Sequence, residues 1–61
     1  MTLKQLRLQK GLTQQELAKM VGISVSAVSK IENGHFVPSL RVAMKIARIL
    51  GTSVEKLFCK V

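Results

Sequence analysis

The chain has 61 residues, a length that supports one small hydrophobic core and excludes a multidomain enzyme. Hydrophobic residues make up 48% of it and charged residues 21%, which is the composition of a folded globule and not of a disordered tail. Ten Lys and Arg residues against three Glu residues give a net charge of +7, so polyanions such as nucleic acid or an acidic membrane are the first partners to consider.

The N-terminal part of the chain predicts two short helices. The first covers about residues 2–10, where Thr2 can serve as the cap and Gly11 stands where a left-handed residue commonly ends a helix. The segment Thr13-Gln14-Gln15-Glu16 then has the pattern of a capping box, in which the hydroxyl and the carboxylate satisfy two unpaired backbone donors. A second helix is therefore expected to run from this box to Val21.

A third helix follows after a very short connection. Ser24 is a good cap, and Asn33-Gly34 supplies the stop. Only Gly22, Ile23 and Ser24 separate this helix from the one before it. A connection that short forces an abrupt change of direction, which is the geometry of a helix-turn-helix formed by the second and third helices.

The C-terminal third predicts two more helices. Ser39 caps a fourth helix that Gly51 closes, and Thr52-Ser53-Val54-Glu55 offers a capping box for a fifth. Since no strand alternation or internal repeat competes with this pattern, the fold class is all-α and the chain is interpreted as one domain, residues 1–61. The buried stripe of the fourth helix is expected to comprise Leu40, Ala43, Ile46, Ala47 and Leu50.

The third helix has one side that packs and one that is left over. A rotation of about 100° per residue places Ser24, Ala27, Val28 and Ile31 on the packed side. The outward side is polar, free of carboxylate, and comprises Val25, Ser26, Ser29, Lys30 and Asn33. An α-helix fits the major groove of B-DNA, where Ser and Lys can contact base edges and Val can touch a thymine methyl group. The alternative is that these are ordinary solvent-facing residues.

Three further residues are candidates for contact with phosphate. Gln14 lies in the first turn of the second helix, where unpaired amides and the helix dipole favour an anion. Asn33 ends the third helix beside a loop that can also face the DNA backbone. Arg41 follows the Ser39 cap closely enough to reach a phosphate, or it is simply exposed.

Several other functions lack suitable residues. One Cys and one His exclude an intramolecular disulfide and a zinc site, and three dispersed Glu residues give no catalytic arrangement, so we expect no metal, cofactor or enzymatic activity. The longest uncharged stretch, residues 20–29, falls short of the ~18 apolar residues of a membrane span, and residues 1–12 do not resemble a signal peptide. We therefore expect a cytoplasmic protein without a membrane partner, and a domain this small leaves little room for a small-molecule ligand.

These motifs together resemble the phage repressor and Cro type of helix-turn-helix domain, also called XRE-like, and most of all its small stand-alone members. The resemblance implies a compact five-helix, lambda-repressor-like domain that binds an inverted-repeat operator as a homodimer, with the second helix of the motif in the major groove. It covers about residues 3–58 and is carried by 13–18 (Thr-Gln-Gln-Glu-Leu-Ala), 22–24 (Gly-Ile-Ser), 28–34 (Val-Ser-Lys-Ile-Glu-Asn-Gly), 38–40 (Pro-Ser-Leu), Ala47 and 50–51 (Leu-Gly).

The resemblance also implies roles for individual residues. It makes Gln14 and Asn33 phosphate contacts, and it assigns base reading to the outward residues Val25, Ser26, Ser29 and Lys30. Many relatives carry Gln or Arg where this chain has Val25 and Ser26, so charge and DNA shape are expected to supply more of the affinity here. Arg7 and Glu32 resemble a structural pair that joins the first helix to the end of the third.

A homodimer would need an apolar interface, and the C-terminal region offers one. The candidates are Val42 and Ile49, which lie off the main stripe of the fourth helix, together with Leu57, Phe58 and Val61. These side chains either form a twofold interface or complete a small core. The function expected from the sequence is a DNA-binding transcriptional repressor, and the competing interpretation is a protein-interaction module, such as the antitoxin of a toxin pair, built on the same fold.

Overall fold

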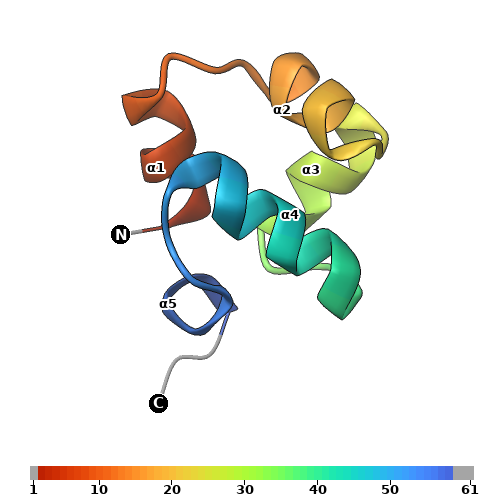
Figure 1. Ribbon diagram of the computed structural model, residues 1–61. Helices are drawn as coiled ribbons and strands as arrows, with labels where there is room; N and C mark the ends of the chain where they lie inside the picture. Colours follow the sequence, from red (N-terminus) through yellow and green to blue (C-terminus); the bar gives the residue numbers. More distant parts are fainter. Residues whose placement is uncertain (1, 59–61) are drawn as a thin grey trace.

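The computed structural model describes residues 2–58, which form five α-helices and measure 29 × 21 × 19 Å overall. The all-α, five-helix prediction is thereby confirmed, and the chain path is shown in Figure 1. Val61, which was predicted to lie in a dimer interface, and Cys59, the one cysteine of the sequence, lie outside the described residues. The helices are α1 (Leu3–Gln9), α2 (Gln14–Val21), α3 (Val25–Glu32), α4 (Leu40–Leu50) and α5 (Val54–Phe58).

Each of the first four helices begins at a hydroxyl side chain that accepts a backbone N–H three residues ahead. The caps are Thr2, Thr13, Ser24 and Ser39, as the sequence indicates. Such a bond satisfies one of the four N–H groups that a helix start leaves unpaired, at about 1 kcal/mol per cap. At α1 the sequence interpretation missed a reciprocal bond, because the Gln5 side chain also accepts from the backbone N–H of Thr2.

One cap prediction was wrong. The fifth helix was expected to start with a capping box built from Thr52 and Glu55, but the backbone N–H of Lys56 donates to the hydroxyl of Ser53 at 3.2 Å. Helix α5 therefore begins at Val54, one residue later than a Thr52 cap would allow. Two hydroxyl residues in succession can each cap a helix, so the local pattern did not distinguish them.

The core lies between the helices and is made almost entirely of aliphatic side chains. Leu17 of α2, Val28 of α3 and Ile46 of α4 are the largest fully buried side chains, so each of these three helices contributes one residue to the centre. Of the five residues predicted to form the buried stripe of α4, Ala43, Ile46, Ala47 and Leu50 are buried, whereas Leu40 is exposed. The stripe prediction was therefore wrong at Leu40, which lies at the edge of the packed side.

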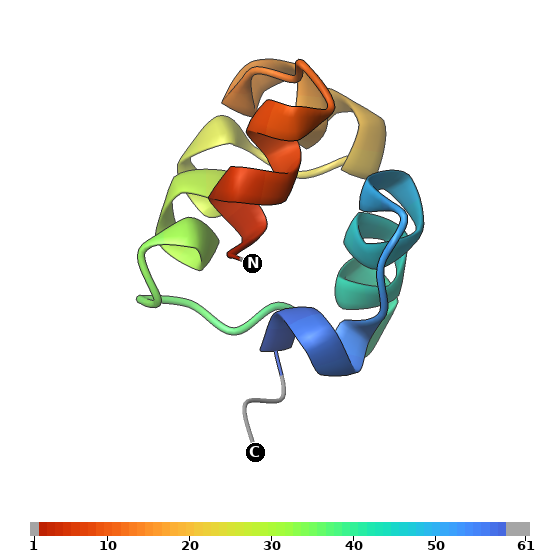
Figure 2. The same cartoon turned by 90° about the vertical axis from the view of Figure 1, so that its left-hand side faces the viewer.

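The arrangement places α3 and α4 on different sides of the molecule. Figure 2 shows α3 and α4 at opposite edges of the view, with α1 between them and α2 above. Helix α2 packs against both α3 and α4 and so links these two helices. The outward sides of α3 and α4 consequently face different directions.

Candidate nucleic-acid interface

The first turn of α2 is held by the predicted capping box. The backbone N–H of Glu16 donates to the Thr13 hydroxyl at 3.0 Å, and the backbone N–H of Thr13 donates to the Glu16 carboxylate at 2.8 Å. The backbone N–H of Thr13 first, and its side chain second, lower the pKa of Glu16 from its ordinary value by hydrogen bonding to the carboxylate. The box fixes the start of α2 and therefore the position of Gln14, the first residue of that helix.

The connection from α2 to α3 is a tight turn centred on Gly22. Its φ of 88° lies in the left-handed region, which a residue with a Cβ adopts only with strain. The N–H groups of Gly22 and Ile23 both donate to the carbonyl of Ala18, which closes the end of α2 before Ser24 caps α3. The helix-turn-helix formed by α2 and α3 is thus present as predicted.

Helix α3 divides into a packed and an outward side, with one exception to the prediction. Val28 and Ile31 are buried, Ala27 is half-buried, and Ser24, which was expected on the packed side, is exposed because it serves as the cap. Ser29 is half-buried. We call the set Val25, Ser26, Ser29 and Lys30 the α3 outward face; apart from Ser29, all of its members are exposed.

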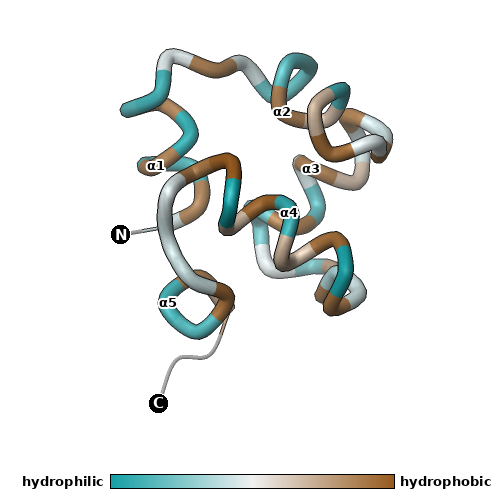
Figure 3. The backbone as a smooth tube through the Cα atoms, in the orientation of Figure 1, coloured by the Kyte–Doolittle hydropathy of each residue, from teal (hydrophilic) through white to brown (hydrophobic). Residues whose placement is uncertain are grey.

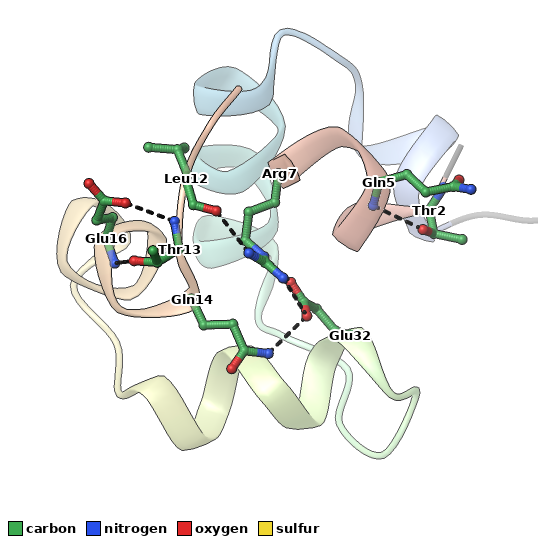
Figure 4. Close-up of polar contacts among 8 residues, drawn as sticks. All are labelled: Thr2, Gln5, Arg7, Leu12, Thr13, Gln14, Glu16 and Glu32. Atoms are coloured by element: carbon green, nitrogen blue, oxygen red, sulfur yellow. Dashed lines mark hydrogen bonds and ion pairs between the residues drawn. The ribbon is translucent and has the colours of Figure 1, made fainter. Parts of the chain in front are cut away.

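A buried ion pair joins α1 to the end of α3. The Nε of Arg7 lies 2.6 Å from Oε2 of Glu32, and Arg7 Nη1 donates to the carbonyl of Leu12 at 2.8 Å. The two side chains are only 7% and 4% exposed. A charge buried this deeply is costly without its partner, so the pair fixes how α3 sits against α1. Figure 4 shows the two side chains meeting between their helices.

Gln14 takes part in the same network, which the sequence interpretation did not foresee. Its Nε2 donates to Oε1 of Glu32 at 3.0 Å, and the contact is drawn in Figure 4. Oε2 of Glu32 accepts from Arg7 Nε, and Oε1 accepts both from Gln14 and, at 3.5 Å, from Arg7 Nη2. The amide nitrogen carries a second hydrogen, so Gln14 can hold a fixed orientation and still donate elsewhere.

The other predicted phosphate contacts are both exposed. Asn33 follows α3, and its backbone N–H donates to the carbonyl of Ser29 at 3.0 Å, so its side chain is presented directly after the α3 outward face. Arg41 lies in the first turn of α4. The structure brings Gln14 and the end of α3 together through Glu32, whereas Arg41 belongs to a separate element.

The residues predicted for a dimer interface differ in accessibility. Leu57 belongs to the core and is 9% exposed, so it has almost no surface to offer a second subunit. Val42, Ile49 and Phe58 are half-buried and pack against the core while keeping part of their surface accessible. A proposed interface therefore rests on these three residues and not on Leu57.

The described residues also bear on metal binding and on membrane insertion. In residues 2–58 no three His, Cys, Asp or Glu side chains gather as they would around a metal ion. None of the helices described between these residues has the length and apolar character needed to cross a bilayer.

Comparison with known proteins agrees with this geometry. Residues 3–57 match the helix-turn-helix family model, and the chain belongs to this family. A regulator of Archaeoglobus fulgidus, named as an uncharacterised HTH-type transcriptional regulator, is 43% identical over 92% of this chain and 80% of its own length. The similarly named MJ0272 of Methanocaldococcus jannaschii is also 43% identical, over 92% of this chain and 85% of its own.

A solved structure shows the same fold. The complex of the SinR protein with the SinI protein matches with a TM-score of 0.83 and 34% identity, over 95% of this chain and 57% of the matched chain. The family and the fold together define a DNA-binding transcriptional regulator. The α3 outward face occupies the second helix of the motif, which is the helix that such proteins place in the major groove.

Proposed function

We propose that the protein is a cytoplasmic repressor that occupies a palindromic operator as a homodimer, with the α3 outward face in the major groove. The observation that carries this proposal is the buried network at Glu32, which holds the start of α2 and the end of α3 in one fixed arrangement. A helix can select a base sequence only if its position relative to the phosphate contacts is fixed. A repressor then acts by excluding polymerase from the occupied site.

Base reading falls to the α3 outward face. Ser26 and Ser29 can donate to or accept from base edges, Lys30 can donate to guanine, and the methyl groups of Val25 can contact a thymine methyl. Val25, Ser26 and Ser29 are too short for the bidentate contacts that Arg, Gln or Asn make, so each of them gives modest discrimination. The sequence dependence of DNA shape supplies part of the selectivity under this proposal.

Affinity comes from the DNA backbone contacts and from overall charge. Gln14 donates to a phosphate at the α2 N-terminus, where the helix dipole favours an anion. Asn33 and Arg41 contact the backbone from the far end of α3 and the start of α4. The net charge of +7 displaces counterions from the duplex, which makes binding weaken steeply as salt rises.

A second copy is needed because one domain of this size reads only half an operator. Val42 and Ile49 lie on the same side of α4, seven residues apart, and Phe58 follows on α5. These half-buried side chains would be covered in a twofold interface. The two α3 helices would then lie about 34 Å apart, one turn of B-DNA.

The proposal is tested by selecting bound duplexes from a random pool and titrating the preferred one at two salt concentrations. We expect an enriched inverted repeat. Ser29→Ala should change the preferred bases and leave the salt dependence almost unchanged. Gln14→Ala should weaken all sequences to a similar extent and reduce the slope of affinity against salt. If no duplex is preferred under any ionic condition, the proposal is wrong.

The role of the network is tested by a double-mutant cycle. Glu32→Gln keeps one acceptor oxygen, but it removes the charge that pairs with Arg7 and leaves an amide nitrogen that cannot accept from Arg7 Nη2 or Gln14. We expect Glu32→Gln to weaken DNA binding by about 5-fold more in the natural chain than in the Gln14→Ala background, since this difference is the worth of the one hydrogen bond that the two residues share. An equal loss in both backgrounds would show that Glu32 acts only on the fold. Circular dichroism at the titration temperature confirms that each variant is folded.

A further inference from the structure

The outer side of α4 carries apolar side chains that the fold leaves uncovered. Seven large apolar side chains are exposed in residues 2–58, and four of them follow one another between positions 36 and 44: Phe36, Val37, Leu40 and Met44. Leu40 is 69% exposed and Met44 is 50% exposed. These two are four residues apart on one helix, so they share one side of it. Neighbouring apolar side chains left in water are typical of a protein-binding surface.

Cations lie beside these apolar side chains. Arg41, Lys45 and Arg48 line one shallow hollow together with Leu40 and Met44, and we call these five residues the α4 outer face. The sequence of α4 contains no Asp or Glu, and in residues 2–58 none of the three cations makes an ion pair. Figure 3 shows apolar and polar segments alternating along α4, as expected for a helix with one packed and one open side.

The α4 outer face points away from the core, and only Arg41, at its N-terminal end, is also a proposed DNA contact. The packed side of α4 is formed by Ala43, Ile46, Ala47 and Leu50, so the outer face is directed into solvent. In Figure 2, α3 lies at the edge of the molecule opposite to α4. A partner on the central part of α4 and a duplex on α3 can therefore be bound at the same time.

We propose that the α4 outer face binds an acidic amphipathic helix of a different protein. Apolar side chains of that helix would cover Leu40 and Met44, and its carboxylates would pair with Lys45 and Arg48. Leu40 and Met44 share one side of α4, so they can pack against the apolar side of a second helix, and methionine adapts readily to a partner's shape.

A second copy of this chain fits the α4 outer face poorly. Two such faces would bring three cations from each copy together. Of the three glutamates in the chain, Glu16 holds the α2 cap and Glu32 holds the buried ion pair, so only Glu55 is left to offset this charge. Like charges opposed in this way disfavour the contact. A duplex would satisfy the cations but would leave Leu40 and Met44 against phosphate.

The test uses a photo-reactive diazirine amino acid in place of Met44 in the whole chain, expressed in its native cells. The matched control carries the same amino acid in place of Met20. Met20 is 55% exposed and lies on α2, outside the α4 outer face. We expect position 44, and not position 20, to cross-link to a segment of another protein that is acidic and has apolar residues at helical spacing. Mass spectrometry of the cross-linked peptide identifies this segment.

A charge reversal provides the second readout. The double variant Lys45→Glu with Arg48→Glu should bind a synthetic peptide of the identified segment at least 10-fold more weakly. Changing the acidic residues of that peptide to Lys should restore its binding to the variant. Retained circular dichroism shows that the variant is folded, and an unchanged order of preference among duplexes shows that α3 is intact. Cross-links only to a second copy or to nucleic acid, no cross-link at position 44, or binding that is insensitive to the reversal would overturn the proposal. These outcomes do not depend on the operator proposed above.

Discussion

The outward sides of α3 and α4 both lack carboxylates, yet they differ in side-chain size and in how firmly they are placed. The α3 outward face has two short hydroxyl side chains, Val25 and one lysine, and it stands on a helix whose end is tied to α1 and α2 through Glu32. The α4 outer face has Leu40 and Met44 among three long cations and no such polar tie. One surface is small, polar and rigidly placed, while the other is apolar, charged and adaptable.

This difference separates two kinds of recognition. Short polar side chains allow a helix backbone to approach base edges closely, and their value depends on accurate placement. Exposed Leu and Met contribute instead by removing apolar area from water, roughly 25 cal/mol per Å², and they need little accuracy. Under the two proposals, the buried network at Glu32 positions the α3 outward face, where base reading depends on geometry. The α4 outer face has no such network, because binding through Leu40 and Met44 depends on buried area.

The largest effect is expected from breaking the network that places α3. Glu32→Ala leaves the Arg7 guanidinium buried without its partner, at a cost of about 3–5 kcal/mol. A chain of this length has only ~3–9 kcal/mol of total stability, so much of the variant should be unfolded at 37 °C. Thermal and urea unfolding followed by circular dichroism measure the loss.

The exposed Glu55→Ala is the matched control for that experiment. Glu55 is on the surface of α5, where a substitution changes stability by about 0.5 kcal/mol or less. If Glu32→Ala has the same melting temperature and urea midpoint as Glu55→Ala, the ion pair does not hold α3 in place. The α3 outward face would then be no more rigidly placed than the α4 outer face.

A smaller effect, on binding alone, comes from placing one carboxylate on each face in turn. Ser26→Asp adds a negative charge to the α3 outward face, where it would oppose the phosphates, and we expect a loss of DNA affinity on the order of 100-fold. Met44→Asp places the same charge on the α4 outer face and should change affinity less than 3-fold, because salt screens it. Both are measured by titration of the selected duplex.

The position of Ser26 makes this comparison robust. It is the second residue of α3, and an acidic residue in the first turn of a helix interacts favourably with the helix dipole. Lost binding in Ser26→Asp therefore has no cause in helix stability. Equal losses in the two variants would mean that DNA does not distinguish the α3 outward face from the α4 outer face.

Local sequence signals were sufficient to predict the helices, and apart from the α5 cap and the Gln5 bond at α1 they failed where the outcome depends on distant residues. Hydroxyl caps and left-handed glycines act within a few residues, so four helix starts and the turn at Gly22 follow directly from the sequence. The contact between Gln14 and Glu32 joins residues 18 positions apart. The only sequence signal was that Gln14 is polar and that Glu32 belongs to a predicted ion pair, and this is too general to specify a hydrogen bond between them.

For Leu57 the sequence left an interface and a core position open, for a related reason. Leu57 and Phe58 are adjacent apolar residues on one short helix, and periodicity cannot tell which of them meets the core when the helix has five residues. In the structure Leu57 is buried and Phe58 is half-buried. Which side of α5 is covered depends on α4, and hence on packing that local patterns do not contain.

The smallest effect concerns the cap that positions Gln14 beside α3. The Thr13 backbone N–H donates to the Glu16 carboxylate and lowers the pKa of Glu16 in the folded chain. Because the folded pKa is below the unfolded one, ionised Glu16 stabilises the fold above the unfolded value of about 4.3, and this contribution is lost as the pH falls through the folded value. We expect the melting temperature to fall more for the natural chain than for Glu16→Gln between pH 6 and pH 3. Glu55→Gln controls for the loss of one negative charge, and acid sensitivity that is the same in all three chains would show that the cap bond does not depend on the charge of Glu16.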